Sequence, residues 1–233
     1  MIYDKEKLVQ ETSEFLATIH PDDLMDSLYC SVIDGDWEMA DTERHRWMKG
    51  GNSVFQTIAH GLTKIVLFPK DMQDVVVKIP FIGINEYAYT ENDDLKLVGR
   101  VDFSGLKSGD YCERESTVYK NAVQAHLEKF FACTEYVADA LGFVPIYASE
   151  RCDPFYSDGM TNRVCLSALS GLDVPNDVVK VLARQYGEDE LMDLEAFLLE
   201  NNVSDLHEGN WGYGKDGKLK IIDYSSFCET FKD

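Results

Sequence analysis

The sequence lacks the features that mark membrane-spanning and secreted proteins. Its apolar runs, such as 75–77 and 221–222, have at most the length of strands. A transmembrane helix needs a run of roughly 20 apolar residues, and none is present. The first residues, MIYDKEKLVQE, are charged and do not show the basic-then-apolar pattern of a secretory signal. We therefore expect a cytoplasmic protein with no membrane partner.

Paired cysteines are also missing. The six cysteines are scattered, with no CxxC pair and no histidine at the spacing of a metal ligand. This distribution favours free thiols in a reducing compartment over disulfides or a zinc site.

Basic residues are scarce: 22 lysines and arginines face 42 acidic residues, for a net charge of −20. Phosphate backbones repel such a surface, so we expect no nucleic-acid partner. An acidic surface can imitate nucleic acid or bind a basic protein. The acids are spread along the chain, however, which favours a general role in solubility.

The hydrophobic pattern divides the 233 residues into three regions: 1–50, 51–150 and 151–233. The first shows helical spacing from Lys5 to about Trp47 and is predicted to be a helical N-terminal extension. The second alternates short strands with one helix around an irregular insertion at about 82–110, and the third is mostly helical. The predicted strands are 54–58, 64–68, 75–79, 131–137, 143–149, 210–213 and 219–223, and the predicted later helices are 111–129, 176–186 and 188–200. A five-stranded sheet crossed by one helix and followed by helices is an α+β arrangement.

The strongest chemical signal lies near the C-terminus. Asn210 comes five positions after Asp205 in the segment DLHEGN, and Asp223 comes thirteen positions after Asn210, at the end of a predicted hairpin. The return strand of such a hairpin brings Asp223 beside Asn210. One carboxylate and one amide oxygen suit Mg²⁺ with several waters retained, and Asp205 is left to face a nucleophile. The alternative is a solvated turn that leads into an edge hairpin.

This triplet resembles the catalytic loop and metal-binding aspartate of the protein-kinase-like superfamily. The motif DLHEGN is similar to the catalytic loop of aminoglycoside and choline phosphotransferases and to that of the short kinase domain of T7-type bacteriophages. The resemblance implies a bilobal fold with a five-stranded antiparallel N-lobe sheet and a truncated, mostly helical C-lobe. It also implies ATP and Mg²⁺ as cofactors, Asp205 as catalytic base, and Asn210 and Asp223 as metal ligands.

The resemblance assigns further ATP-binding residues upstream. Lys78, on the third strand of 51–150, matches the lysine that holds the α- and β-phosphates. Glu115 is the preferred glutamate partner for it, with Glu113 as the rival. Residues 150–152 fall where a hinge presents backbone groups to adenine, which places Glu150 and Cys152 there.

The sequence departs from the superfamily in several places. Gly61 alone remains of the glycine-rich lid over the phosphates. Val203 and Ser204 stand in place of a histidine and an arginine, and Tyr224 and Ser225 in place of Phe-Gly. His207 is expected to pack beneath the loop, although a phosphate contact is the alternative.

Ten residues follow Asp223, so we expect the phosphate acceptor to be held by residues 1–50, by 82–110 or by a second subunit. The favoured function is an ATP- and Mg-dependent protein Ser/Thr kinase. One alternative is a pseudokinase or an acidic interaction or inhibitor protein that binds nucleotide or a partner protein. Another is a small-molecule kinase or an AMP-transferase. A homo-oligomer is compatible with all of them.

Overall fold

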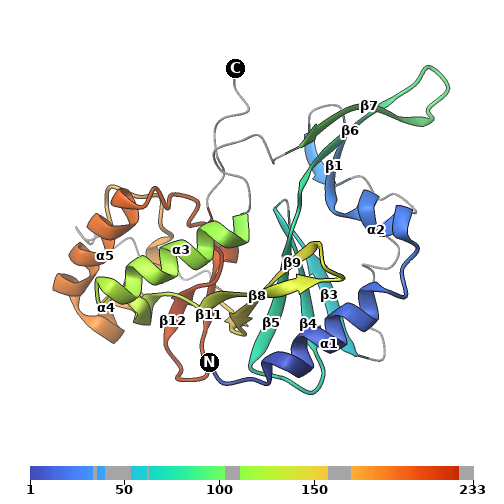
Figure 1. The fold of residues 1–233 in the computed structure, drawn as a ribbon. Helices are drawn as coiled ribbons and strands as arrows, with labels where there is room; N and C mark the ends of the chain where they lie inside the picture. The colour runs from blue at the N-terminus through green and yellow to red at the C-terminus, as the bar shows by residue number, and fades with distance from the viewer. Residues whose placement is uncertain (34–35, 40–53, 62, 103–110, 157–168, 226–233) are drawn as a thin grey trace. The chain divides into compact units, whose positions relative to one another are not determined.

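The computed structural model describes residues 1–33, 36–39, 54–61, 63–102, 111–156 and 169–225. The chain divides into two compact units. We call Ile2–Glu113 with Glu135–Ser149 the sheet unit, and Met1, Arg114–Thr134 and Glu150–Asp233 the helical unit (Figure 1). No helix in the described ranges is both long and apolar enough to cross a membrane.

The sheet unit contains a five-stranded antiparallel sheet, as the sequence predicts. Its strand order is β3-β4-β5-β9-β8. The strands are β3 (Phe55–His60), β4 (Lys64–Pro69), β5 (Val75–Pro80), β8 (Thr134–Ala140) and β9 (Val144–Glu150). All six residues of β5 are buried, because this strand lies at the centre of the sheet.

Two helices precede this sheet in the chain. They are α1 (Lys5–Leu16) and α2 (Pro21–Ser27). Asp4 caps α1 by accepting a hydrogen bond from the Lys7 N–H at 3.0 Å. The buried residues of α1 recur every four positions, and the Phe15 ring packs edge-on against Phe55 of β3 at 5.2 Å between centroids. These contacts place α1 against the five-stranded sheet.

A second sheet of the same unit was not predicted. Its strand order is β2-β1-β6-β7, with β1 and β6 parallel. The strands are β1 (Tyr29–Ile33), β2 (Asp36–Met39), β6 (Gly83–Tyr89) and β7 (Leu95–Asp102). The helical prediction for 5–47 is therefore wrong for Tyr29–Ile33 and Asp36–Met39, and residues 34–35 and 40–47 lie outside the described ranges. The prediction of irregular structure for 82–110 is wrong for 83–102, and residues 103–110 lie outside the described ranges.

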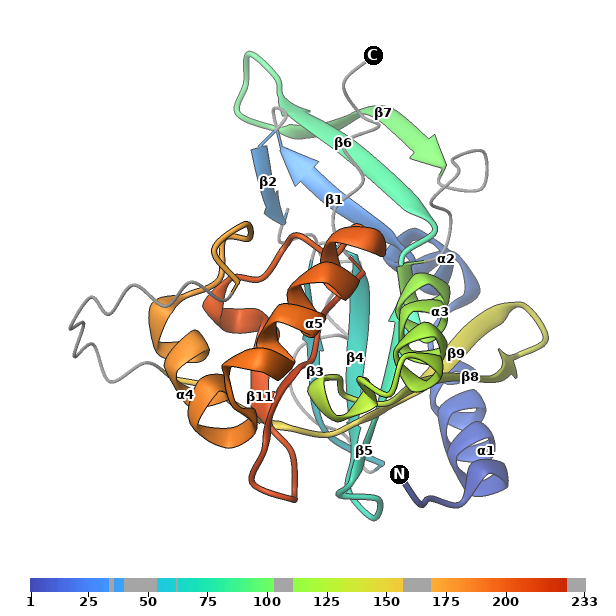
Figure 2. The same cartoon turned by 90° about the vertical axis from the view of Figure 1, so that its left-hand side faces the viewer.

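The helical unit begins with most of α3 (Tyr111–Gln124) and the short 3₁₀ turn η3 (Glu128–Phe130). It continues with α4 (Asn176–Tyr186) and α5 (Glu188–Glu200), which lie side by side (Figure 2) and match the predicted bounds. Gly187 joins the two helices with φ at +90°, a conformation that glycine adopts without strain. Leu191, Leu194 and Leu198 form an apolar face of α5, and all three are fully buried.

The chain closes on a small three-stranded sheet in the helical unit. Its order is β10-β11-β12, comprising β10 (Asp153–Pro154), β11 (Trp211–Tyr213) and β12 (Leu219–Ile221), with the 3₁₀ turn η4 (Glu208–Asn210) just before β11. The predicted C-terminal hairpin is thus confirmed. Phe131 forms an isolated parallel bridge with Ile221, which anchors the hairpin to the segment after α3.

Candidate functional site

The loop that carries Asp205 starts where α5 ends. Asn202 has φ at +52°, which turns the chain out of the helix, and the Val203 N–H then donates to the Leu198 carbonyl at 2.8 Å. Val203 and Leu206 are each 1% exposed, so their side chains anchor the loop in the core on both sides of Asp205. The backbone at Asp205 is therefore fixed from both directions.

Asn210 closes this loop through its side chain. The Asn210 Nδ2 donates to the Asp205 carbonyl at 2.8 Å, and the Asn210 N–H donates to the His207 carbonyl at 2.9 Å. The neighbouring Trp211 Nε1 donates to the Leu206 carbonyl at 2.9 Å. Because the amide nitrogen of Asn210 is used inside the loop, the side-chain oxygen is the atom left to bind a cation.

The hairpin brings Asp223 next to Asn210. Trp211 pairs with Ile221 across β11 and β12, and the Ile222 N–H donates to the Asn210 carbonyl at 2.8 Å. Asp223 is the next residue, and its Oδ1 accepts a hydrogen bond from the Ser225 hydroxyl at 3.1 Å. Asn210, just before β11, and Asp223, just after β12, therefore lie at the same end of the hairpin.

Asp205 presents its carboxylate to solvent. The side chain is 45% exposed, and its Oδ1 lies 3.8 Å from the Nε2 of His207. His207 accepts a hydrogen bond from the Gly209 N–H on its Nδ1 at 3.1 Å, so the Nε2 of the neutral ring carries the proton that faces Asp205. The His207 side chain is 65% exposed, which corrects the expectation that it packs beneath the loop.

The chemistry of these donors fits a magnesium ion. The Asn210 side-chain oxygen and the Asp223 carboxylate are hard oxygen ligands, and Mg²⁺ in phosphate chemistry takes one or two protein oxygens and completes its shell with water and phosphate. Over the described ranges, no group of three or more His, Cys, Asp or Glu side chains could hold a metal ion. A zinc-like or fully protein-caged site is therefore not formed by those residues.

Glu115 lies close to the same hairpin. It is fully buried on α3, whereas the rival Glu113 is exposed. Burial and, next, the negative charge of Glu115 raise the pKa of Tyr224, the residue after Asp223, well above its ordinary value. The Tyr224 hydroxyl donates to the Ala132 carbonyl at 2.6 Å, which fixes this segment against the chain that follows α3.

Glu150 has a role that the sequence did not reveal. Its carboxylate accepts two hydrogen bonds from the Lys220 Nζ, at 2.7 and 2.9 Å, and the two side chains are 19% and 11% exposed. The Glu150 N–H donates to the Cys133 carbonyl at 2.8 Å, so an adenine contact at Glu150 would have to come from its carbonyl. The ion pair joins residues 70 positions apart, and no motif in the sequence marks it.

Cys152 lies beside β11. A Cβ on Gly212 would lie 2.9 Å from both the Cys152 Cβ and the Asp153 carbonyl oxygen. Only glycine therefore fits where β11 packs against residues 152–153. The segment 150–154 therefore lies against the same hairpin that carries Asn210 and Asp223.

Lys78 and Gly61 belong to the sheet unit. Lys78 pairs with Val66 within the five-stranded sheet and is 5% exposed. Its predicted pairing with Glu115 joins the two units and stays a prediction. The Gly61 N–H donates to the Lys64 carbonyl at 3.0 Å inside the β3–β4 hairpin, so in this conformation it is not available to a phosphate.

The helical unit also has an open pocket of about 440 Å³ between α3 and α5. Polar side chains dominate its lining, and it contains none of the predicted site residues. The lining residues are Asn121, Gln124, Ala125, Phe197, Glu200 and Asn201.

The comparisons with known proteins include a distant likeness in fold. No family model matches the sequence, and no curated protein matches it. Among solved structures, the chain is similar to that of an apo pseudokinase, at 12% sequence identity and a TM-score of 0.33. The match covers 84% of this chain and 59% of the other, so the chain spans less than two thirds of that protein's length.

Proposed function

We propose that the chain is an ATP- and Mg-dependent phosphotransferase with a protein-kinase-like fold, which transfers the γ-phosphate to a hydroxyl group. One observation carries the proposal. The Asp205–Asn210 loop and the β11–β12 hairpin are locked by backbone and side-chain hydrogen bonds, and they hold the Asn210 side-chain oxygen and the carboxylates of Asp205 and Asp223 on one loop and one hairpin. Phosphoryl transfer depends on positioning and charge neutralisation, and such a rigid arrangement of oxygens supplies both.

Each residue then has a defined task. Asn210 and Asp223 would hold Mg²⁺ against the phosphates of ATP, and Asp205 would orient the acceptor hydroxyl and accept its proton. ATP supplies the phosphoryl group: the new bond joins the acceptor oxygen to the γ-phosphorus, and the bond from that phosphorus to the bridging oxygen breaks, which releases ADP. Lys78 is proposed to bind the α- and β-phosphates, with Glu115 as its partner.

A protein Ser or Thr side chain is the favoured acceptor. The Asp205 carboxylate is 45% exposed, so a hydroxyl group on a large substrate can reach it without entering an enclosed pocket. A small-molecule acceptor would instead be expected to need a surrounding pocket.

A second candidate is nucleotide binding without catalysis, as in a pseudokinase or an acidic inhibitor protein. Val203 favours it, because an apolar side chain that is 1% exposed occupies the position where the superfamily has a histidine. The buried Glu115 and the Asn210–Asp223 pair fit both candidates, since nucleotide binding needs them equally.

The test is incubation of the purified chain with Mg-[γ-³²P]ATP, alone and with a mixture of basic and acidic test proteins. Asp205→Ala and Asp223→Ala are each expected to lower incorporation by about 100-fold or more, since each removes a group that acts on the reacting phosphate. Asp173→Ala is the matched control, because Asp173 is an exposed aspartate of the helical unit. Label that persists at the wild-type level in both site variants would overturn the proposal.

Two further measurements separate the candidates. A thermal-shift titration with Mg-ATP is expected to stabilise the wild type and Asp205→Ala but not Asp223→Ala. Stabilisation without any incorporation would support nucleotide binding alone. Mass spectrometry of the labelled protein then distinguishes an added phosphate from an added AMP.

A further inference from the structure

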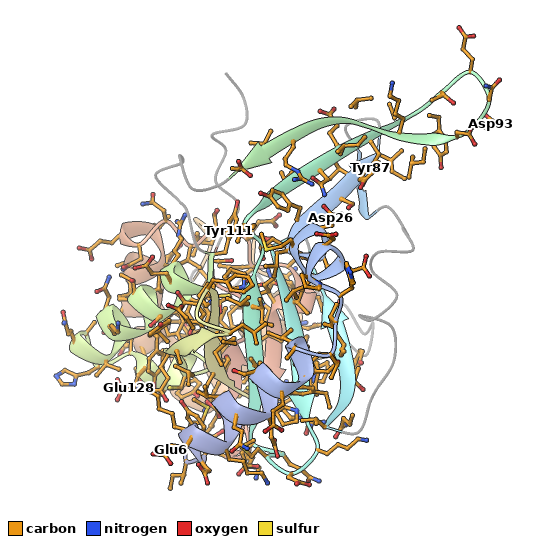
Figure 3. The ribbon with its side chains drawn as sticks, turned by 45° about the vertical axis from the view of Figure 1, so that its right-hand side comes forward. Glu6, Asp26, Tyr87, Asp93, Tyr111 and Glu128 are labelled. Carbon is orange, nitrogen blue, oxygen red and sulfur yellow. The ribbon has the colours of Figure 1, made fainter. Side chains whose placement is uncertain are left out.

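The second sheet of the sheet unit ends in an open edge. β7 is the last strand in the order β2-β1-β6-β7, and in the described part of the chain no strand pairs with its outer side. Six of its eight residues are exposed, on both faces of the strand. The β6–β7 hairpin projects from its sheet (Figure 1), and Asp93 lies at its tip (Figure 3). An exposed edge of this kind offers its backbone N–H and C=O groups to another chain.

Apolar side chains line this edge. Leu97 is 39% exposed, Val98 58% and Val101 44%. Tyr89, at the end of β6, is 57% exposed. Charges are a usual protection of edge strands, and β7 carries Lys96, Arg100 and Asp102. Arg100 and Asp102 are held in hydrogen bonds within the unit. Apolar side chains beside an unpaired strand edge are a feature of protein interaction sites.

The edge is held rigidly at its base. The Arg100 Nε donates to the Asn85 side-chain oxygen at 2.8 Å, and its terminal nitrogen reaches Asp26 of α2 at 3.0 Å. The Tyr29 hydroxyl donates to Asp102 at 2.6 Å. An ordered edge binds an incoming strand at a lower entropic cost than a flexible one.

Charge indicates what kind of chain the edge would bind. Glu86, Glu91, Asp93 and Asp94 lie on the hairpin, and in the described part of the chain none of them forms an ion pair; Lys96 is the free basic residue beside them. A second copy is a poor occupant, since each copy carries a net charge of −20.

We propose that the outer edge of β7 (Leu95–Asp102) binds an extended, lysine- or arginine-rich segment of a partner protein by β-strand addition. The apolar residues of that segment contact Leu97, Val98 and Val101, and its basic residues lie near the acidic tip. The main-chain hydrogen bonds supply affinity, and the alternate side chains supply specificity. This inference goes beyond the proposed phosphotransferase activity and requires neither ATP nor catalysis.

The test measures binding of a fluorescent peptide by anisotropy. The probe alternates valine and threonine over eight residues and has three lysines at one end; a matched peptide has glutamates instead. The full chain is expected to bind the lysine peptide, to bind it more weakly as salt is raised, and not to bind the glutamate peptide. Amide hydrogen exchange over 95–102 is expected to slow when the lysine peptide is bound.

Two pairs of variants locate the binding site. Glu91→Lys with Asp94→Lys reverses the charge at the tip and is expected to weaken binding about tenfold or more. Asp93 is left unchanged because its φ is +59°, a conformation that lysine adopts at a cost. The charge-matched control is Asp173→Lys with Asp193→Lys, at two exposed positions of the helical unit.

The apolar variant is Leu97→Lys with Val101→Lys, which is expected to abolish binding. Its control is Phe143→Lys, because Phe143 is 52% exposed in the same unit, in the turn between β8 and β9. The proposal is wrong if the peptide does not bind, if the tip and edge variants bind as well as their controls, or if exchange slows elsewhere than 95–102. It is also wrong if sedimentation shows a wild-type dimer that Leu97→Lys with Val101→Lys separates, since a second copy would then occupy the edge.

Discussion

The Lys220–Glu150 ion pair provides the most quantitative test of the helical unit. Lys220 on β12 makes two hydrogen bonds to Glu150 at 2.7 and 2.9 Å, and a longer contact of 3.5 Å to Asp216. Lys220→Met keeps most of the side-chain volume and removes the charge. Glu150, which is only 19% exposed, then keeps its negative charge without a positive partner. Removal of one partner from a buried pair is strongly destabilising because the remaining charge is poorly solvated.

The expected loss can be placed between two limits. An exposed pair contributes about 0–1 kcal/mol, and removal of one partner from a buried pair costs about 3–5 kcal/mol. Because both side chains are mostly buried, we expect Lys220→Met to lower the free energy of unfolding by about 3 kcal/mol. For a chain of this size, that corresponds to a fall in melting temperature of roughly 6–12 °C.

The assay is chemical denaturation followed by far-UV circular dichroism on the wild type, Lys220→Met, Glu150→Gln and the double variant. The loss of unfolding free energy in the double variant is expected to be about 2 kcal/mol smaller than the sum of the losses in the two single variants. Each single variant already breaks the ion pair, so its loss is counted twice in the sum. A loss of less than about 1 kcal/mol for Lys220→Met would refute the reasoning, since the pair would then behave as a surface pair.

The same pair predicts a dependence on pH. Burial lowers the pKa of Lys220, but the hydrogen bond to Glu150 and the charges of Glu150 and Asp216 outweigh it, so the pKa is raised above 10.5. A raised lysine pKa contributes stability below the unfolded pKa and loses it as pH rises through the folded pKa. The difference between wild type and Lys220→Met is therefore expected to be constant through neutral pH and to shrink in strongly alkaline solution.

Two further predictions concern the hairpin and the thiols. Gly212→Ala is expected to lower the free energy of unfolding by about 1–3 kcal/mol, because the new Cβ would lie 2.9 Å from atoms of Cys152 and Asp153. A melting temperature equal to that of the wild type would contradict the close packing of β11 against residues 152–153. Burial raises the pKa of the Cys30 thiol to about 12. Cys30 is therefore expected to resist a disulfide reagent at mildly alkaline pH in the folded protein, while the partly exposed Cys152 reacts. Peptide mapping of the labelled thiols checks that Cys152 is modified before Cys30.

The elements that the sequence predicts correctly have a regular hydrophobic period and a clear end signal. The helices 176–186 and 188–200 were predicted with their observed bounds, because a strong apolar stripe in each is interrupted at Gly187. The sequence predicts the central strand β5 because it begins with the apolar run Val-Val-Val, and Ile79 follows directly after Lys78. Patterns of this kind depend on local residues alone.

The second sheet was missed for physical reasons. β1 follows α2 without glycine or proline, and its partner β6 lies about 54 positions further on, in parallel. A short apolar run of this kind fits a helix or a strand equally well. β7 is exposed on both faces and its pairing contains a bulge, so it shows no alternation of apolar and polar residues. Because β7 is exposed on both faces, its sequence lacks the pattern that predicts a strand. The same exposure is the basis for its proposed role as a binding edge.

The candidate site has the same division between local and distant contributions. Asp205, Asn210 and Asp223 lie within one loop and one hairpin, and each of the hydrogen bonds that arrange Asn210 spans a short stretch of chain. Their spacing in the sequence could therefore predict that they lie on one loop and one hairpin. Glu150 and Lys220 lie 70 positions apart in the chain, and no local pattern encodes their pairing. It follows that variants of the ion pair should act mainly on the stability of the helical unit, whereas variants of the loop should act on the proposed phosphoryl transfer.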